Sequence, residues 1–277
     1  MKYMNYIAAD SAPEVATSAI KLHGESGFQG MRAAGRLAAE TLDFIAPHVV
    51  PGATTDEIDA LCRDFVADRG ALSAPFMYRG YPKSICTSVN HVVCHGIPGP
   101  RRLKEGDILN IDVTPILDGW HGDTSRMFLL GEVSVRARRL VDVTYEALLL
   151  GIAQVKPGNR LGDIGHAIQQ YAEGQRCSVV TEFCGHGLGR VFHDAPNVMH
   201  FGRQGSGDEL REGMIFTIEP MINLGRPDTK VLDNGWTAVT RDRTLSAQFE
   251  HSVGVTADGV EIFTLSPKGY TKPPYNE

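Results

Sequence analysis

The sequence predicts an α/β (α+β) fold in which one domain is formed by two pseudo-symmetric halves. The first observation is an internal repeat: LKEGDILNID, from Leu103 to Asp112, matches LREGMIFTIE, from Leu210 to Glu219, at an offset of 107 residues. The second is a Pro-Gly turn with an acidic residue and Ile after it, which recurs at an offset of 106 residues. Two matches at nearly equal offset indicate duplication rather than coincidence. Because a solenoid needs three or more repeats, each half is expected to cover one side of a shared sheet.

Apolar residues at helical spacing define the helices of the first half. Residues 1–27 lack a clear pattern and are interpreted as an N-terminal arm. Residues 31–46 are predicted to form the first helix, and the Pro51-Gly52 turn follows it. Thr54 and Glu57 match a capping box, which opens the second helix.

Strands and two further helices complete the predicted order. Residues 84–98 predict strand, turn and strand. Helices are predicted over residues 136–155 and from Leu161 to Tyr171, where apolar residues again recur at helical spacing. More strands are expected after Gly174, in the segments CSVVTEFCGHG, MIFTIEPMIN, WTAVTRD, SAQFEHSVGVT and VEIFTL.

The stretch GDILNIDVTPILDGWHGDTS predicts a β-hairpin around the Asp118-Gly119 turn. A two-residue loop there places Thr114 opposite Asp123. Because side chains alternate along a strand, Asp112 and Asp123 share one face, a diagonal step apart. Two such carboxylates need a metal, a shared proton or a basic partner. Pro115 cannot donate a ladder hydrogen bond, so the first strand is expected at an edge or with a bulge, which would shift this register.

Composition narrows the class of protein. The 277 residues carry a net charge of −6, which argues against a nucleic-acid partner, and 42% of them are hydrophobic, as in ordinary globular proteins. We find neither an apolar run of membrane-spanning length nor a signal peptide, so no membrane partner is expected. The five cysteines are odd in number and lack CxxC spacing. They favour free thiols in a reducing compartment.

Several acids and one histidine fall on predicted strands. A carboxylate within an apolar strand is costly to bury unless it is paired or binds a metal. Four carboxylates and one imidazole suit two divalent ions bridged by carboxylates, with Mn, Fe, Co or Zn as candidates. The repeat makes two of the acids equivalent, so a pseudo-twofold axis could bring the halves together at one cluster. The candidate ligands are Asp112, Asp123, His186, Glu219 and Glu250.

The composite resembles the type I methionine aminopeptidases. The resemblance lies in YRGYPKSICTSVNHVVCHGIP, NIDV with DGWHGDTS, CGHGLGRVFHDAP, FTIEPM and SAQFEH. It covers about residues 28–265 and implies a pita-bread fold, with duplicated helix-strand halves around a shared, curved antiparallel sheet. Residues 28–277 are then a single catalytic domain whose halves span roughly 28–130 and 131–265.

The resemblance also implies a role for each ligand. Asp112 would chelate one metal, and Asp123 and Glu250 would bridge both. His186 and Glu219 would complete the shell of the second metal. The nucleophile would be a water or hydroxide between the metals, with a pKa lowered by the cations. Glu219 would also act as the general base.

Further residues match the family's substrate site. His95 and His193 would contact the scissile peptide, and His193 would steady the carbonyl oxygen as charge develops. An apolar cup that tolerates sulfur suits a methionine side chain. The resemblance implies a cup formed by Tyr78, Tyr81, Cys86, Phe192 and Trp236.

The expected activity is removal of the initiator methionine from nascent proteins whose second residue is small. The family suggests a cytoplasmic monomer that meets the ribosome transiently, and the native metal stays open. Two alternatives remain: another pita-bread peptidase, such as an Xaa-Pro aminopeptidase, and a non-catalytic binding protein of the same fold.

Other polar residues are expected to have ordinary roles. His200 and the histidines outside the proposed site are expected to be structural, and His251 points to the strand face opposite Glu250. Asp107, Asp118 and Asp194 are expected to be turn or surface acids.

Overall fold

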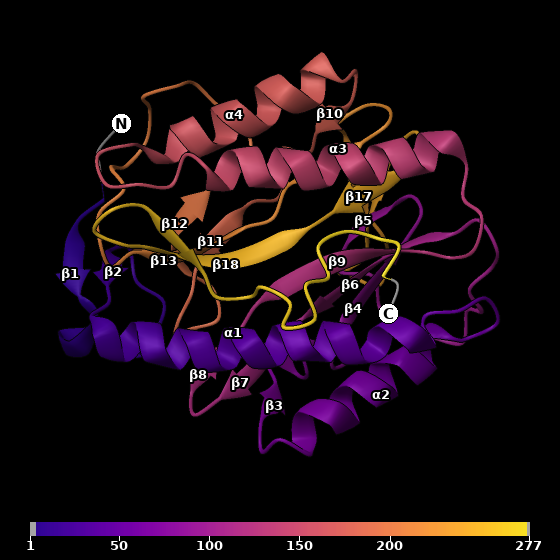
Figure 1. Cartoon of the computed structure of the whole chain (residues 1–277), viewed down its shortest axis with the longest axis horizontal. Coiled ribbons are helices and arrows are strands. Elements are labelled where there is room, and N and C mark those ends of the chain that lie inside the picture. The colour runs from indigo at the N-terminus through magenta and orange to yellow at the C-terminus, as the bar shows by residue number, and fades with distance from the viewer. Residues whose placement is uncertain (1–3, 276–277) are drawn as a thin grey trace.

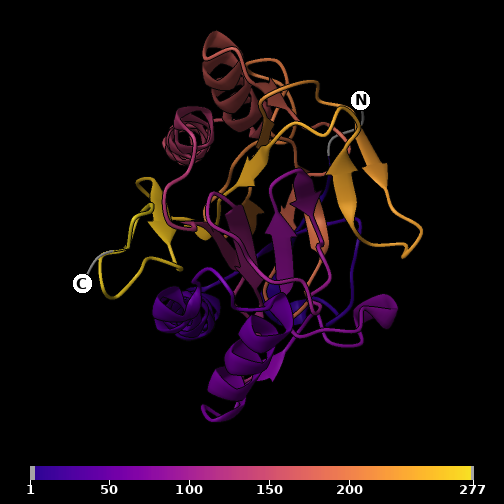
Figure 2. The same ribbon diagram turned by 90° about the vertical axis from the view of Figure 1, so that its right-hand side faces the viewer.

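A computed structural model describes residues 4–275, and a large antiparallel sheet forms its centre (Figure 1). The strand order is β12-β11-β13-β18-β9-β6-β4, with β19 paired to β18. Figure 2 shows that the sheet curls, with the long helices gathered on one side of it. The strands are β4 (Cys86–Val89), β6 (Ile108–Val113), β9 (Thr124–Leu129), β11 (Gly185–Gly187), β12 (Asp194–Val198), β13 (Ile215–Ile218), β18 (Glu250–Val255) and β19 (Val260–Ile262).

Two pairs of helices cover the sheet. In Figure 1, α1 (Glu25–Ile45) and α2 (Thr55–Ala67) lie along one half, and α3 (Val135–Ile152) and α4 (Leu161–Gly174) lie along the other. The predicted capping box at α2 is confirmed: the Glu57 N–H donates to Thr54 Oγ1, and the Thr54 N–H donates to Glu57 Oε2. The first helix was predicted too short, because α1 begins within the weakly patterned arm.

Smaller sheets surround the large one. They contain β1 (Tyr6–Ala8) with β2 (Ile20–Leu22), β3 (Leu72–Ser73) with β7 (Pro115–Leu117) and β8 (Trp120–His121), β10 (Ser178–Val179) with β14 (Met221–Asn223) and β17 (Ser246–Gln248), and β5 (Val92–Cys94) with β15 (Thr229–Val231) and β16 (Ala238–Thr240). None of the helices described between residues 4 and 275 has the length and apolar content needed to cross a bilayer.

The predicted duplication is visible in the large sheet. β4, β6 and β9 form one side, β11, β13 and β18 form the other, and β9 pairs with β18 where the halves meet. Equivalent turns make equivalent bonds: the Gly52 N–H donates to Leu103 O (2.8 Å), and the Gly158 N–H donates to Leu210 O (3.1 Å). The sequence repeat therefore corresponds to a pseudo-twofold arrangement around a shared sheet.

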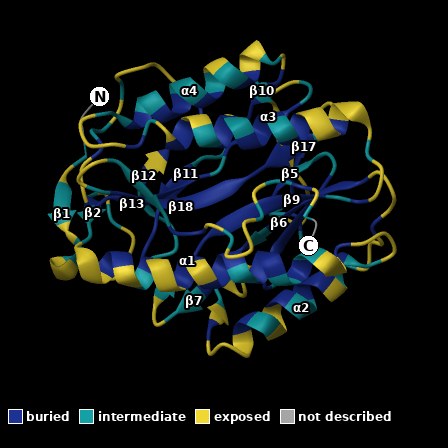
Figure 3. Ribbon diagram, in the orientation of Figure 1, coloured by how far each residue is buried: buried dark blue, intermediate teal, exposed yellow. Residues whose placement is uncertain are grey.

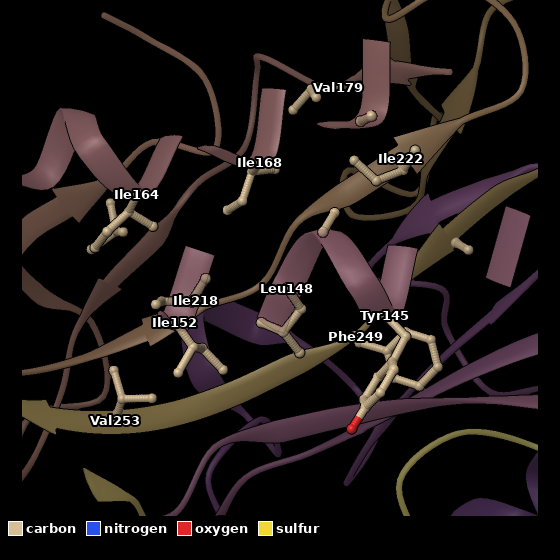
Figure 4. Close-up of a cluster of buried hydrophobic side chains, with 14 of the residues drawn as sticks. Tyr145, Leu148, Ile152, Ile164, Ile168, Val179, Ile218, Ile222, Phe249 and Val253 are labelled. Carbon is tan, nitrogen blue, oxygen red and sulfur yellow. The ribbon is translucent and has the colours of Figure 1, made fainter. Parts of the chain in front are cut away.

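Each half has a hydrophobic core between its helices and the sheet. Strand residues alternate between this core and the opposite face: Ile111 and Val113 belong to the core under α1, whereas Asp112 between them lines the opposite face. Figure 3 shows the central strands buried and the outer helix faces exposed. The core of the second half (Figure 4) includes Tyr145, Leu148, Ile152, Ile164, Ile168, Ile218, Ile222, Phe249 and Val253.

The predicted hairpin register is confirmed. Leu117 pairs with Trp120 in β7 and β8, and Val113 pairs with Thr124 in β6 and β9. The same register thus holds on both sides of Pro115, which is the first residue of β7 and accepts a hydrogen bond from the Gly122 N–H (2.9 Å). Pro115 marks the point where the strand leaves the large sheet, and no bulge shifts the two aspartates apart.

Candidate metal centre

The four predicted carboxylate ligands converge because the strand register aligns them. In adjacent strands, Asp112 of β6 pairs with Ser125 of β9, and Ser125 pairs with Glu250 of β18. Directly opposed residues share a face of an antiparallel sheet. Asp123 lies two residues before Ser125 and so points the same way. Glu219 follows β13, whose last residue pairs with the neighbour of Glu250.

One cavity of about 360 Å³ contains all of these side chains. The ligand atoms of Asp123, His186 and Glu250 lie within 4.8 Å of one another. His186 Nε2 is 3.6 Å from Asp123 Oδ2 and 3.7 Å from Glu219 Oε1. Asp112 lines the same cavity and raises the pKa of Asp123 and Glu250 through charge repulsion. The structure therefore brings the acids of both halves to one cluster.

Burial perturbs the pKa of every candidate ligand, and repulsion between carboxylates adds to it at three of them. Burial raises the pKa of Asp112 to about 7 and that of Glu219 to about 8. Burial and neighbouring carboxylates raise the pKa of Asp123 and Glu250 well above their ordinary values. Burial lowers the pKa of His186 to about 4, so its imidazole is neutral at pH 7 and able to bind a metal.

The donor set fits a divalent cation. Four buried carboxylates need compensating positive charge. Within residues 4–275, Arg79 is the one lysine or arginine side chain that lines the cavity, and it is exposed. His186, the nearest basic group, stays neutral. Oxygen donors with one imidazole and no thiolate in the cluster match divalent transition metals.

Three residues that the sequence analysis did not assign to the site hold Glu219 in place. Thr217 Oγ1 donates to Glu219 Oε1 (2.8 Å), and Gln248 Nε2 donates to Glu219 Oε2 (3.3 Å). The Glu219 N–H donates to Nε2 of His200 (3.0 Å), whose ring is fully buried. Strand alternation could have found Thr217 and Gln248, each two residues before a ligand. No sequence signal singled out His200.

The two additional histidines predicted for the site also line the cavity. His193 packs against the tilted ring of His186, with ring centroids 4.2 Å apart, and stacks on Tyr78, at 5.1 Å. Burial and neighbouring histidines lower its pKa to about 2. His95 has a backbone φ of 53°, a left-handed conformation unusual for a non-glycine residue and often associated with functional sites.

The predicted aromatic cup lies beside the ligands. Tyr78 and Phe192 pack edge to face at 5.0 Å, and Tyr81 and Trp236 do so at 5.1 Å. Cys86 sits opposite Asp112 in β4 and lines the same cavity. Every side chain predicted for the site therefore lines one cavity, which has a carboxylate-rich part and an aromatic part.

A carboxylate and imidazole cluster at the join of two sheet halves is typical of a metal-dependent enzyme, and the chain's relatives show that the class is that of metallopeptidases. The chain matches the metallopeptidase family M24 over residues 29–257 and belongs to that family. A protein of Rickettsia prowazekii, a methionine aminopeptidase, is 60% identical over 257 residues, which cover 92% of this chain and 99% of the relative.

Solved structures agree with this assignment. The crystal structure of methionine aminopeptidase from Rickettsia prowazekii superposes with a TM-score of 0.88 at 60% identity and covers 89% of this chain and 100% of that chain. A prolidase from Pyrococcus horikoshii superposes at 0.70 with 18% identity and covers 88% of this chain and 63% of that chain, which shows the shared fold alone. The expected pita-bread fold is confirmed.

Proposed function

We propose that this enzyme removes the N-terminal methionine from polypeptides whose second residue is small. The observation that carries this proposal is the single cavity in which a metal-ligand cluster adjoins an aromatic cup. Relatives named methionine aminopeptidase match it over nearly their full length, including one at 60% identity and one from Escherichia coli at 50%. Sequence identity favours this activity over that of the Xaa-Pro enzymes, because an Xaa-Pro dipeptidase and an X-Pro aminopeptidase of the same fold are only 23% and 19% identical to this chain.

We further propose that the site holds two divalent ions, with Co, Mn, Fe or Zn as candidates. Asp112 would bind one of them, Asp123 and Glu250 both, and His186 with Glu219 the other. When bound, such cations lower the pKa of water and supply a nucleophile near neutral pH. Carboxylates account for four of the five donors, and their unbalanced charge supports occupancy by more than one cation.

The protein's own groups then handle protons and orientation. Glu219 accepts the proton of the attacking water, and Thr217 and Gln248 orient its two carboxylate oxygens. His193 remains a neutral imidazole at pH 7 and donates its N–H to the scissile carbonyl oxygen as negative charge develops. His95, which directly follows β5, contacts the same peptide.

The aromatic cup would hold the methionine side chain. Tyr78, Tyr81, Phe192 and Trp236 offer ring faces and edges, and a thioether packs well against both. The Cys86 thiol is buried, and burial raises its pKa, so it contributes an uncharged wall. A flexible apolar side chain therefore fits this part of the cavity.

We also propose the compartment, the natural substrates and the oligomeric state of the enzyme. All five cysteines are free, which supports a reducing compartment, the cytoplasm. Nascent polypeptides would be its substrates, met transiently at the ribosome, and the enzyme would act as a monomer.

A peptide-release assay tests this function. Purified protein with Mn or Co is expected to release methionine from Met-Ala-Ser peptides and to leave intact Xaa-Pro peptides that begin with a residue other than methionine. Glu219→Ala and His186→Ala are expected to lower kcat by about a hundredfold or more, because each removes a metal ligand and Glu219 is also the base. Full activity of Glu219→Ala, or of metal-free protein, would contradict the mechanism.

A further inference from the structure

The N-terminal arm packs against the part of the chain that carries His193. Strand β2 of the arm contacts β12, which begins at Asp194. Ile20 of β2 is 1% exposed and belongs to the core of the second half. Figure 1 shows β1 and β2 at the end of the molecule where β12 also lies. The arm is therefore packed against the segment that leads into the candidate site.

A largely buried ion pair joins the arm to this segment. Lys21 Nζ lies 2.8 Å from Asp194 Oδ2, and the two side chains are 11% and 5% exposed. The same ammonium group donates to Pro13 O (2.9 Å) and Val15 O (3.0 Å). Lys21 thus uses all three of its protons and folds the arm around Asp194.

The second carboxylate oxygen of Asp194 is also fully used. Oδ1 accepts the Thr17 N–H of the arm (2.8 Å) and the Ala195 N–H of β12 (2.9 Å). The expectation that Asp194 is a turn or surface acid is therefore wrong. The Asp194 side chain is shielded from solvent because the arm covers its carboxylate and supplies two of its partners.

This attachment fixes one end of an irregular segment. Residues 188–193 connect β11 to β12 without forming a helix or strand. At their start, the His121 N–H donates to Gly189 O (2.9 Å), and the His121 ring lies beside the same oxygen. At their end, Asp194 is bound to the arm. His193 immediately precedes Asp194, so the arm contacts restrict where its ring can lie.

A second contact between arm and segment is much weaker. Glu14 Oε1 lies 3.5 Å from Arg190 Nε, and these side chains are 67% and 44% exposed. Exposed pairs contribute little, whereas loss of one partner from a buried pair leaves an uncompensated charge. Of these two ion pairs, the Lys21–Asp194 pair is therefore expected to hold the segment more strongly.

We propose that residues 13–21 form a clamp, with Lys21 as a positioning residue that holds His193 in place through Asp194. This inference rests on the proposed function, in which His193 contacts the scissile carbonyl. A displacement of about 1 Å in a group that stabilises developing charge can lower a rate by about a hundredfold. The clamp would therefore set the efficiency of the reaction from outside the cavity.

Kinetics of the metal-loaded enzyme test the clamp. Lys21→Met is expected to lower kcat on Met-Ala-Ser by about tenfold or more with little change in KM, because His193 acts on the transition state. Lys21→Arg keeps the charge and is expected to restore most of the rate. Glu14→Gln, the matched arm variant with an exposed pair, is expected to stay within about twofold of the wild type. Wild-type kcat in Lys21→Met overturns the proposal.

Amide hydrogen exchange tests the same clamp without activity. In Lys21→Met, exchange is expected to accelerate across residues 188–196 and to stay unchanged across residues 108–129, which carry Asp112 and Asp123. Unchanged exchange in residues 188–196 means that the arm does not hold the segment. Accelerated exchange across both regions points to general destabilisation and equally overturns a local clamp.

A double variant separates the clamp from the proposed role of His193. If His193→Ala lowers kcat, adding Lys21→Met is expected to lower it little further, because the group being positioned is already gone. Full additivity overturns the clamp's action through His193. If His193→Ala retains wild-type kcat, the role of His193 in the proposed function is wrong, and the exchange experiment still decides whether the clamp exists.

Discussion

Glu219 illustrates how single residues set the chemistry of this cavity. Its side chain is bound by Thr217 and Gln248, and its backbone N–H is bound by His200. Burial lowers the pKa of His200 to about 3, so the ring is neutral and its Nε2 can accept a hydrogen bond from the amide. His200 therefore belongs to the machinery that orients Glu219, although it does not line the cavity.

A substitution at His200 tests that role. His200→Ala is expected to lower the free energy of unfolding by about 1–3 kcal/mol, because the Glu219 N–H is left buried without an acceptor. Urea denaturation measures the loss, and kcat is expected to fall with it. His200→Gln offers a carbonyl acceptor and should recover part of both. Equal losses in the two variants would show that volume, not the hydrogen bond, matters at this position.

At the scale of elements, the hairpin depends on a close approach by α1. A Cβ built on Gly122 would lie 2.1 Å from Ala34 O, a backbone atom of α1 that cannot move by itself. Gly122 immediately precedes Asp123, so the spacing between helix and hairpin also sets the position of a proposed metal ligand. This contact joins elements that are far apart in the sequence.

A Gly→Ala pair tests that packing. Gly122→Ala is expected to destabilise the protein by about 1–3 kcal/mol or more through overpacking and to weaken metal binding, measured by calorimetric titration with Mn. Gly99→Ala is the matched control, because no atom lies within 4 Å of its built Cβ and its φ is not in the left-handed range. The idea is refuted if the two variants unfold at the same denaturant concentration.

At the scale of the whole molecule, the buried carboxyl groups of the candidate metal site make the stability of the metal-free protein depend on pH. In metal-free protein, the folded-state pKa values of Asp112 and Glu219 are about 7 and 8, above the ordinary carboxyl range. The folded state therefore holds protons that the unfolded chain releases. The stability that these bound protons contribute to the folded state is fully present below about pH 4 and is lost as the pH rises through 7 to 8.

Removal of the metal makes this dependence of stability on pH measurable. Chelator-treated protein is expected to unfold at progressively lower temperature as the pH rises from 5.5 to 8. The free energy of unfolding should fall by up to about 1.4 kcal/mol for each unit by which folding raises the pKa of one carboxyl group. Adding Mn should raise the midpoint most at pH 8, where the carboxylates repel each other most strongly. Glu219→Gln removes one titrating group, so its metal-free profile should be flatter. A wild-type slope in that variant, measured by calorimetry, contradicts the assignment.

The sequence by itself determined the local and repeated features of this protein. The Thr54 capping box, the Asp118-Gly119 turn and the duplication follow from rules that act over a few residues or compare two segments directly. The alternation of strand side chains was enough to place Asp112 and Asp123 on one face. The family resemblance then predicted a set of side chains that all line one cavity.

Only the tertiary structure decided the contacts between distant segments. His200 and Gln248 reach Glu219 across 19 and 29 residues, and Lys21 reaches Asp194 across 173 residues. Local patterns carry no record of such pairs, because a buried polar residue is identified by its partner and not by its neighbours in sequence. For that reason Asp194 was expected at the surface, and the arm lacked any assigned role until its buried ion pair was seen.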